Sequence, residues 1–338
     1  KDTNSNGVID SGELLGAATV TAGGAWSATP TTAMTAGTYT IKANVTDLAG
    51  NVSAASTGLA LTIDTSKPVA PAALALAAAS DTGVSAIDKV TSDTTPTITG
   101  TGENGATVTL FRDANNNGLV DGGEAVGTAT VASGKWSIDA STLADGVNNL
   151  KAVQTDPVGN ISPASTALAI TIDTVANAPA SLDLATASDT GLSSTDNNTR
   201  TTAPVVTGTA EAGATVQLKE GDTILGTAIA GTTGVWSITS ATLAEGVHNL
   251  TAVQTDKAGN VSDASAALTL TIDLSAESAP GTPDLDASSD LGASNTDDYT
   301  SDTTPTFGGT GLIEGHKVQV FKDTNSNGVI DSGELLGA

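Results

Sequence analysis

The sequence predicts an all-β protein, an extended array of tandem immunoglobulin-like antiparallel β-sandwiches. Three observations predict this fold class: a repeat of roughly 100 residues, short runs of alternating apolar and polar residues, and a composition dominated by small and turn-forming residues. The chain has 338 residues, which suits about three domains of ordinary size. Only 2% of the residues are aromatic and 14% are charged, so a helical class rich in Leu, Glu and Lys is disfavoured.

Three tryptophans mark the internal repeat. Trp26, Trp136 and Trp236 stand in the strings GAWSATPT, GKWSIDAS and GVWSITSA, and a strand-like string that ends in D-x-x-G-N follows each. Each module closes with a string such as ALAITID, after which an Ala/Pro-rich joint leads to an SDTG-like string and a new opening strand. We expect each tryptophan to fill the core between two sheets, and we weigh this against a role in stacking on a ligand.

The alternation within a module indicates strands and argues against disorder. Residues 106–113 read ATVTLFRD, in which Ala106, Val108 and Leu110 share one face. Such runs, bounded by Gly, Asn and Asp, are typical of half-buried antiparallel strands. About seven such strands in roughly 100 residues are typical of an immunoglobulin-like sandwich.

The repeat divides the chain into four predicted segments. We expect a partial module with the latter strands and an Asp/Asn-rich loop at its start, a complete module with such a loop, a complete module without it, and a partial module with the opening strands and the loop. In that order they span residues 1–74, 75–174, 175–274 and 275–338.

The two ends of the sequence share one string. Residues 1–17 and 322–338 both read KDTNSNGVIDSGELLGA, which indicates a recent duplication and a longer parent protein. A half sandwich exposes apolar faces and unpaired strand edges. We therefore expect further copies of the repeat as partners. The strand near residues 318–321 would pair with the N-terminal segment of the next copy, in the same chain or in a neighbouring chain by strand complementation.

The charge balance excludes several classes of partner. The formal net charge is −25, from 37 acidic and 12 basic residues, which disfavours nucleic acid and anionic lipid. No apolar run is long enough to insert this segment into a membrane, and without cysteine there are no disulfides or thiolate ligands. Two interpretations remain for the acids: a soluble, self-repelling surface, or neutralisation by cations in the folded state.

Residues that could support catalysis are sparse. His248 and His316 are the only histidines and occupy unrelated positions, and the sequence has no Ser/His/Asp set, phosphate loop or HExxH motif. We expect neither catalytic residues nor an organic cofactor, and we predict that the protein is not an enzyme.

One motif is specific for calcium. The string DTNSNGVIDSGE at 2–13 matches the twelve-residue calcium loop of EF-hands, and the pattern recurs at 113–124 and 323–334. Calcium takes about six to eight oxygen ligands, so short Asp and Asn side chains converge on it while a glycine permits the sharp turn and a final glutamate closes the site. The predicted ligands, including one backbone carbonyl per loop, are Asp2, Asn4, Asn6, Val8, Asp10 and Glu13; Asp113, Asn115, Asn117, Leu119, Asp121 and Glu124; and Asp323, Asn325, Asn327, Val329, Asp331 and Glu334.

The setting of these loops differs from an EF-hand. Strand-like strings flank the loop at 113–124, so we interpret it as a calcium-binding insertion in a β-hairpin; the alternative is an Asn/Asp/Gly-rich turn without metal. The module at 175–274 has LKEGDTILGT at this place, with Gly221-Asp222 as an ordinary tight turn. We expect no ion there.

The D-x-x-G-N motif gives a second set of candidate metal ligands. One interpretation is a β-turn in which Asp accepts backbone hydrogen bonds. The other is a calcium site at the module junction, in which this Asp is joined by the terminal-strand Asp and by the Asp of the following SDTG-like string. The candidate junction sets are Asp47, Asp64 and Asp81; Asp156, Asp173 and Asp189; and Asp256, Asp273 and Asp290.

Several strings resemble a known family over the whole chain. TSDTTPTITGTGENGATV, SDTG and D-x-x-GNVS are similar to the bacterial Ig-like tandem repeats of giant, type-I-secreted, calcium-dependent surface adhesins of the Bap-like and RTX type. The resemblance implies extended cell-surface rods that bind Ca²⁺ at module junctions and support adhesion or biofilm formation. The chain departs from the commonest repeats by its EF-hand-like hairpin loop, so the hairpin site depends on the loop chemistry alone.

Three functions remain in competition. The first is a calcium-rigidified extender or stalk segment of a large bacterial cell-surface adhesin, outside the cell. The second is the repeat unit of an extracellular filament or sheath that assembles head to tail by strand complementation. The third is an array of carbohydrate-binding modules, which the scarcity of aromatic side chains for sugar stacking disfavours.

Overall fold

The structure is a computed structural model that describes residue 6 and residues 9–337. The chain divides into two compact units, Lys1–Ala176 with Asp256–Val261, and Asn177–Thr255 with Ser262–Ala338. The described residues form strands, turns and bends without a helix, which confirms the predicted all-β class of tandem immunoglobulin-like domains. In this part of the chain there is accordingly no helix with the length and apolar character needed to cross a membrane.

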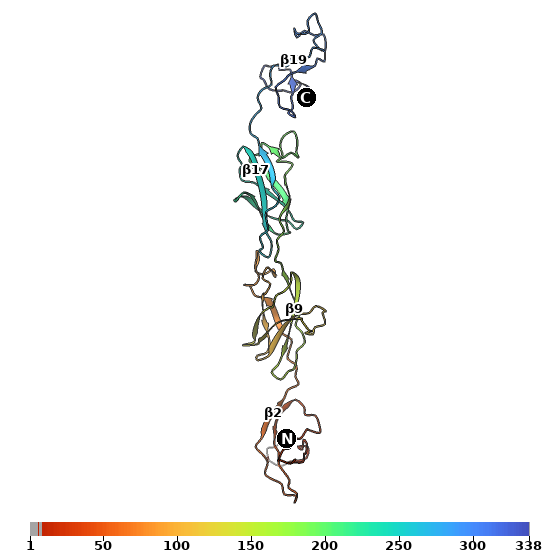
Figure 1. Cartoon of the computed structure of the whole chain (residues 1–338), viewed down its shortest axis with the longest axis vertical. Helices are drawn as coiled ribbons and strands as arrows, with labels where there is room; N and C mark the ends of the chain where they lie inside the picture. The colour runs from red at the N-terminus through yellow and green to blue at the C-terminus, as the bar shows by residue number, and fades with distance from the viewer. Residues whose placement is uncertain (1–5, 7–8, 338) are drawn as a thin grey trace. The chain divides into compact units, whose positions relative to one another are not determined.

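The first sandwich, called sandwich A, consists of two sheets of the first unit (Figure 1). The smaller sheet is antiparallel and has the order β3 (Ala72–Leu76), β5 (Thr97–Thr101), β8 (Lys135–Asp139). The larger sheet has the order β4 (Val90–Thr91), β10 (Leu168–Ile172), β9 (Gly146–Thr155), β6 (Thr107–Arg112), β7 (Ala125–Thr130). Only the pair β4–β10 is parallel in this larger sheet.

Alternate residues of both sheets form the core of sandwich A. Ile98 of β5 and the pair Val108 and Leu110 of β6 are fully buried, as the period-two pattern predicts. Leu150 of β9 and Ile172 of β10 complete this layer from the neighbouring strands. Each such side chain contributes about 1.5–3 kcal/mol by its removal from water.

A tryptophan packs directly on a glycine in this core. Trp136 of β8 is 4% exposed, and its Nε1 donates to the carbonyl of Thr101 at 3.2 Å. A Cβ added at Gly100 would lie 2.3 Å from Cζ2 of this ring, so only glycine fits at that place in β5. The prediction of a core tryptophan is confirmed for Trp136 and also for Trp236, which is 2% exposed.

The second sandwich, called sandwich B, belongs to the second unit and repeats this topology (Figure 1). Its smaller sheet has the order β11 (Ala180–Leu184), β13 (Val205–Thr209), β16 (Val235–Thr239). Its larger sheet has the order β12 (Asn198–Thr199), β18 (Leu268–Ile272), β17 (Gly246–Thr255), β14 (Thr215–Glu220), β15 (Thr223–Ile229). Trp236 packs on Gly208 of β13, where an added Cβ would lie 2.4 Å from the ring.

Two strand pairs follow in the second unit. They are β19 (Asp284–Leu285) with β20 (Phe307–Gly308), and β21 (Val320–Phe321) with β22 (Leu335–Gly337), both antiparallel. The first pair resembles the opening strands of a sandwich, and the second pair flanks the last EF-hand-like loop.

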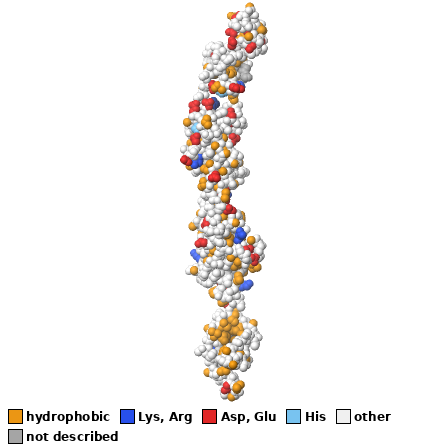
Figure 2. Space-filling model, in the orientation of Figure 1, with side chains coloured by type: hydrophobic (Ala, Val, Ile, Leu, Met, Phe, Trp, Pro, Cys, Tyr) orange, Lys and Arg blue, Asp and Glu red, His pale blue; other side chains and the backbone are white. Residues whose placement is uncertain are grey.

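The N-terminal segment, residues 9–65, contains one described strand pair, β1 (Gly37–Ile41) with β2 (Leu59–Ile63). Trp26 of this segment is 58% exposed, so the prediction of a core position is wrong for this tryptophan. Figure 2 shows hydrophobic side chains gathered over this part of the chain, at the lower end of the view. The large apolar side chains exposed in the segment are Ile9, Leu14, Val20, Trp26, Val45, Leu48, Val52 and Leu59.

Sandwich B contains one histidine, His248, whose two ring nitrogens both lie within hydrogen-bond distance of a partner. Nδ1 of His248 lies 2.8 Å from Oε1 of Glu220, and Nε2 lies 2.9 Å from the carbonyl of Ala244. Burial lowers the pKa of His248, but the hydrogen bonds with the Ala244 carbonyl and the Glu220 carboxylate outweigh it and raise this pKa above 6.5. The corresponding residue of sandwich A, Asn148, also donates to the carbonyl of an alanine, at 2.9 Å.

We expect His248→Asn to remove a pH-dependent part of the stability of sandwich B. Because the folded pKa is raised, protonated His248 stabilises the fold fully below its ordinary pKa of 6.5 and loses this effect as pH rises through the folded value. The loss should be about 0.5–1 kcal/mol, since Glu220 is partly exposed. Denaturant unfolding at about pH 6 and about pH 9 measures it. A wild-type chain equally stable at both would contradict the assignment.

Candidate metal sites

The hairpin β6–β7 carries the loop at 113–124 on its closing end. Arg112 donates its backbone N–H to the carbonyl of Glu124 at 2.9 Å, so the residue before the loop is paired with the last loop residue. Gly118 has a φ of 72°, which a glycine adopts without strain and which allows the chain to reverse in the middle of the loop. The sequence therefore folds into a closed loop between two paired strands, as predicted.

The polar side chains of this loop converge. The carboxylate of Asp113 accepts hydrogen bonds from the backbone N–H groups of Asn117 and Gly118, each at 3.0 Å. The amides of Asn115 and Asn117 both approach Oδ2 of Asp121, at 2.8 and 2.9 Å. Glu124 folds back and accepts from the backbone of Asp121 at 3.1 Å and of Ala114 at 3.0 Å. The predicted ligands thus present three carboxylates and two side-chain amides from one short segment, and carboxylate and amide oxygens are the donors that Ca²⁺ prefers.

The loop at 323–334 has the same arrangement. Asp323 accepts from the backbone of Asn327 at 3.1 Å and of Gly328 at 2.9 Å, and Asn325 and Asn327 donate to Asp331 at 2.7 and 2.9 Å. Hydrogen bonds from these two amides lower the pKa of Asp331. Glu334 is 4% exposed, and hydrogen bonds from Thr324 and from the backbone of Asp331 lower its pKa. Val329 donates its backbone N–H to Oδ1 of Asn327 at 2.8 Å.

The loop at 2–13 is described in part. Asn6 donates to Oδ2 of Asp10 at 2.9 Å, and Glu13 accepts from the backbone of Asp10 at 3.0 Å, as the equivalent residues do in the other loops. The predicted ligands Asp2, Asn4 and Val8 lie outside the described residues.

A lysine lies beside the loop of sandwich A, and sequence reasoning missed it. Nζ of Lys151 lies 2.8 Å from Oδ2 of Asp113 and 2.9 Å from Oδ1 of Asn116. The hydrogen bond from Lys151 is the largest cause of the lowered pKa of Asp113. The signal was present in the repeat: Lys42 and Lys151 stand at one position in the modules that have the loop, and Thr251 replaces them in the module that lacks it.

We expect Lys151→Met to raise the calcium affinity of the loop at 113–124 about tenfold, because the ammonium group competes with the ion for Asp113. Isothermal titration calorimetry measures this change. Lys219→Met is the matched control, because Lys219 lies on β14, whose hairpin has no such loop. A lower affinity after Lys151→Met would mean that the lysine holds the loop in its binding shape instead.

The hairpin of sandwich B closes as predicted for a module without the loop. Strands β14 and β15 stay paired up to Glu220 and Thr223, and Gly221 and Asp222 make the two-residue turn between them. A two-residue turn offers too few oxygen atoms for a calcium ion.

The D-x-x-G-N strings form turns around their aspartate. Oδ1 of Asp156 accepts from the backbone of Val158 at 3.0 Å and of Asn160 at 2.8 Å, and Oδ2 accepts from the Asn160 amide at 2.7 Å. Asp47 and Asp256 make the equivalent bonds with Asn51 and Asn260. Burial raises the pKa of Asp156, but these hydrogen bonds outweigh it and lower the pKa; the bonds from Asn51 lower the pKa of Asp47.

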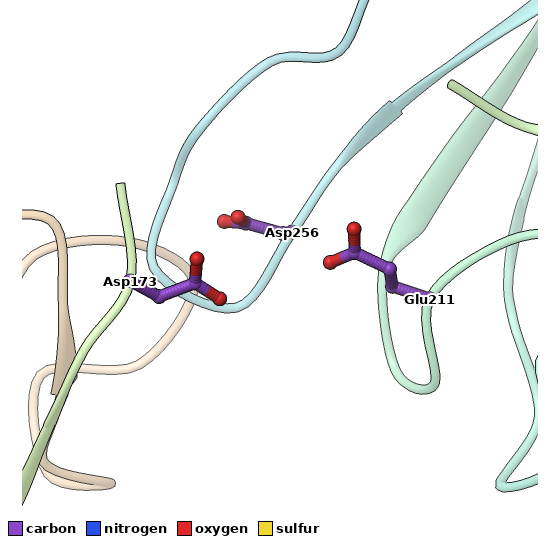
Figure 3. A group of neighbouring side chains, drawn as sticks. All are labelled: Asp173, Glu211 and Asp256. Atoms are coloured by element: carbon purple, nitrogen blue, oxygen red, sulfur yellow. The ribbon is translucent and has the colours of Figure 1, made fainter. Parts of the chain in front are cut away.

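The same turns reach the end of the preceding terminal strand. Nδ2 of Asn160 donates to the carbonyl of Asp64 at 3.2 Å, and Nδ2 of Asn260 donates to the carbonyl of Asp173 at 2.8 Å. In the second case one carboxylate oxygen of Asp173 and one of Asp256 come within 4.8 Å of each other. Figure 3 shows these two side chains. Two acids this close repel each other unless a cation or a proton lies between them.

A glutamate in each of the two sandwiches was missed from the sequence. The backbone N–H of Glu103 donates to Oε1 of buried Gln154 at 2.9 Å, and Oε1 of Glu103 accepts from Val69 at 2.9 Å. Glu211, the third side chain labelled in Figure 3, is held in the same way, by Gln254 at 2.8 Å and by Asn177 at 2.7 Å. The strings TGENG and TAEAG after the opening strand, together with the Gln of AVQTD, are the signal that could have found it.

The structure regroups the predicted junction ligands. Gly146 pairs with Ile172, so Asp156 beyond the end of β9 and Asp173 beyond the end of β10 lie at opposite ends of sandwich A, about 30 Å apart. The pairing of Gly246 with Ile272 separates Asp256 from Asp273 in the same way in sandwich B. An aspartate of the turn therefore meets the terminal Asp of the preceding module and not that of its own.

The aspartates of the SDTG-like strings lie beside the terminal strand of their own module. The short strand β4, which follows Asp81, pairs with the end of β10, and Asp173 donates its backbone N–H to the carbonyl of Thr91 at 2.9 Å. Asp189 of sandwich B is placed alike, because Asp273 donates to the carbonyl of Thr199 at 2.9 Å. Asp81 and Asp189 therefore belong to the modules in which they were predicted, but they lie at the Asp173 and Asp273 ends of those modules and not at the ends that meet Asp64 and Asp173. Asp290, the third member, is 4% exposed.

Comparison with known proteins identifies the repeated unit. Residues 2–65, 68–174 and 176–274 match the model of the family described as bacterial Ig-like domain. A search of curated proteins found no match to this chain.

Three solved structures illustrate the similarity. A biofilm-associated protein (BSP domain) is 20% identical with a TM-score of 0.22, over 62% of this chain and 30% of that chain. A 1.5-MDa bacterial ice-binding adhesin is 22% identical with a TM-score of 0.32, over 68% of this chain and 71% of that chain. The fibronectin(III)-like modules of Clostridium thermocellum CbhA are 14% identical with a TM-score of 0.29, over 56% and 92% of the two chains.

Proposed function

Because the chain belongs to the bacterial Ig-like domain family, we propose that it is a calcium-rigidified extender segment of a large bacterial adhesin on the outside of the cell. The observation that carries the proposal is a closed hairpin loop in which hydrogen bonds hold the side chains of Asp113, Asp121 and Glu124 within twelve residues, an arrangement repeated at 323–334. Such loops have the all-oxygen donor set of a calcium site. A net charge of −25 destabilises the compact chain through self-repulsion, and bound cations would relieve this repulsion.

The junction supports rigidification in particular. The Asn160–Asp64 bond joins the turn of sandwich A to the end of β2, Asn160 also fixes the carboxylate of Asp156, and the carboxylate of Glu103 accepts from Val69 in the joint that follows β2. A calcium ion held by Asp64, Glu103 and Asp156 would tie the N-terminal segment to sandwich A. Asp173, Glu211 and Asp256 are the equivalent residues of the next repeat.

Weak binding suits this setting. Each hairpin loop offers three carboxylates and two amides, and extracellular modules of this kind bind calcium at roughly 10⁻⁴–10⁻³ M. The chain would stay flexible where calcium is scarce and stiffen where it is abundant, because binding and ordering are coupled.

Small-angle X-ray scattering of the whole chain tests the proposal. We expect the maximum dimension to be longer and better defined in calcium than in EDTA. The double variant Asp156→Asn with Glu103→Gln should reduce the calcium-dependent increase in the maximum dimension. Asp222→Asn, in the tight turn of sandwich B, should leave this increase unchanged. Identical scattering curves with and without calcium would overturn the proposal.

A second candidate is the repeat unit of a filament that assembles head to tail by strand complementation. It is favoured because Trp26 lacks a covering strand in the described part of the chain, while the glycine position that would cover it, Gly309, faces open space. Trp26 is 58% exposed, whereas its counterparts Trp136 and Trp236 are covered by a strand that bears a glycine. Gly309 stands at the place of that glycine in the string PTFGGTG, and nothing lies within 4 Å of where its Cβ would be. The strand around Gly309 of one copy could therefore cover Trp26 of another.

Gly309→Val separates the two candidates. A valine there would collide with a docked tryptophan, because a Cβ at Gly100 would come 2.3 Å from the ring of Trp136, yet it has open space in the single chain. If filaments form, light scattering in calcium should grow with chain concentration for the wild type and stay at the monomer value for the variant. A wild type that remains monomeric, or a variant that assembles equally well, rejects the filament.

A further inference from the structure

An amine, a carboxamide and a carboxylate meet beside the loop of sandwich A. Nζ of Lys151 lies 2.8 Å from Oδ2 of Asp113 and 2.9 Å from Oδ1 of Asn116. Because a carbonyl bond is about 1.23 Å long, the side-chain carbonyl carbon of Asn116 lies within about 4.1 Å of this nitrogen. A lysine amine is a nucleophile, and the fold already holds it beside an electrophilic carbon, which makes their reaction intramolecular.

The loop fixes these groups and shields two of them from water. The side chains of Asp113 and Lys151 are 1% and 16% exposed. Two backbone N–H groups, of Asn117 and Gly118, hold the Asp113 carboxylate at 3.0 Å each. Asn116 is exposed and its Nδ2 has no hydrogen-bond partner among the described residues, so ammonia released from this amide can escape to solvent.

The repeat contains this combination once. Asn116 has a φ of 56°, and Ser326, at the same place in the last loop, has a φ of 57°, so the backbone shape is shared and the side chain is not. Serine also occupies this place in the first loop, and Thr251 replaces Lys151 in the module without a loop. Among the three loops, only that of sandwich A has a carboxamide at this place.

We propose that Lys151 and Asn116 join in an intramolecular isopeptide bond and that Asp113 transfers the protons. The Lys151 ammonium group passes a proton to the Asp113 carboxylate, and the free amine attacks the side-chain carbonyl carbon of Asn116. Asp113 then protonates Nδ2 and accepts the second proton of Nζ, and the C–Nδ2 bond breaks as the new amide is completed. Ammonia leaves and takes up the remaining proton. Ammonium and carboxamide thus give a secondary amide and an ammonium ion, and the reaction requires no oxidant or reductant.

The link changes both the charge and the connectivity of sandwich A. It closes a ring that spans 35 positions, which lowers the entropy of the unfolded chain as any cross-link does. Nζ becomes a neutral amide nitrogen and no longer competes with a cation for Asp113, so the gain in calcium affinity expected from Lys151→Met applies to the unlinked chain. The inference goes beyond the proposed function, because it concerns covalent chemistry and is tested without calcium.

Intact mass spectrometry of the whole chain, kept in EDTA so that no ion occupies Asp113, tests the proposal. The wild type should weigh about 17 Da less than its sequence, because one ammonia has left. Asn116→Ser and Lys151→Arg should each have the full mass of their sequences, since serine offers no carboxamide and the arginine guanidinium stays protonated. Asp113→Asn should slow the loss of ammonia about a hundredfold. Lys135→Arg, on β8, should keep the loss of mass.

A protease digest locates the bond. Tandem mass spectrometry should find a branched peptide that joins Asn116 to Lys151. A wild type of full mass would overturn the proposal. A loss of about 18 Da with the branch at Asp113 would also overturn it, because that is the loss of water from a carboxylic acid. So would a loss of ammonia without any branched peptide, which a succinimide at Asn117–Gly118 would give.

Thermal unfolding in EDTA gives an independent readout. Asn116→Ser and Lys151→Arg should each lower the melting temperature of sandwich A by about 10 °C and leave that of sandwich B unchanged, because each removes the cross-link. Serine is a conservative choice for folding, since Ser326 has the same backbone conformation. Melting temperatures equal to that of the wild type in both variants would contradict the link.

Discussion

Trp136→Ala should destabilise sandwich A by about 3–5 kcal/mol, which is a large part of the stability of a small domain. The indole is 4% exposed, lies on Gly100 and donates to Thr101, so its removal opens a cavity and leaves the Thr101 carbonyl without this donor. Amide hydrogen exchange, resolved by peptide, should show lost protection across β5, β6 and β8 and normal protection in sandwich B.

The chain contains its own control for this change. Trp26→Ala removes the same side chain from an exposed position and should change stability by less than about 0.5 kcal/mol in dilute solution. Trp236→Ala should reproduce the large loss in sandwich B, because Trp236 packs on Gly208 as Trp136 does on Gly100. Equal losses for Trp26 and Trp136 would contradict the packing described here.

The second large effect is expected from calcium at the hairpin loops. The double variant Asp113→Ala with Glu124→Ala should bind one calcium ion fewer. It should also lose most of the calcium-dependent rise in the melting temperature of sandwich A. At calcium about 100-fold above Kd, one ion stabilises the fold by about 2.7 kcal/mol, which sets the size of the loss. Differential scanning calorimetry in calcium and in EDTA measures it.

Asp222→Ala is the matched variant in sandwich B. Because Asp222 lies in a two-residue turn, its replacement should leave the number of bound ions and the calcium response unchanged. The same loss of ions from Asp222→Ala as from the double variant would show that the hairpin loop is not the binding site.

The sequence was sufficient for the fold because alternation and repetition act locally. Period-two runs such as residues 106–113 bury Val108 and Leu110 in the structure, and the repeat places Trp136 and Trp236 alike. Trp26 departed from this rule because a tryptophan is buried only when an opposite strand covers it, and the covering strand is a nonlocal feature.

The residues of the hairpin loops could be predicted from the sequence, whereas the grouping of residues at the junctions could not. The loop at 113–124 is one contiguous string, so its spacing already fixes which side chains converge. The junction joins residues that are more than eighty positions apart, such as Asn260 and Asp173, and only strand direction decides which end of a sandwich each one occupies. Glu103 and Lys151 were missed for the same reason, because each meets its partner across strands.

The antiparallel pairing of β9 with β10 gives each module two different ends, with a D-x-x-G-N turn at one and a terminal aspartate at the other. The asparagine of the turn bonds the terminal aspartate of the preceding module in both cases, Asn160 with Asp64 and Asn260 with Asp173, so the same pair of residues recurs from one repeat to the next. Unequal recombination can then add or delete whole repeats without a new interface having to evolve. The identical strings at 1–17 and 322–338 are what such exchange leaves behind, and the length of the array becomes a property that selection can adjust.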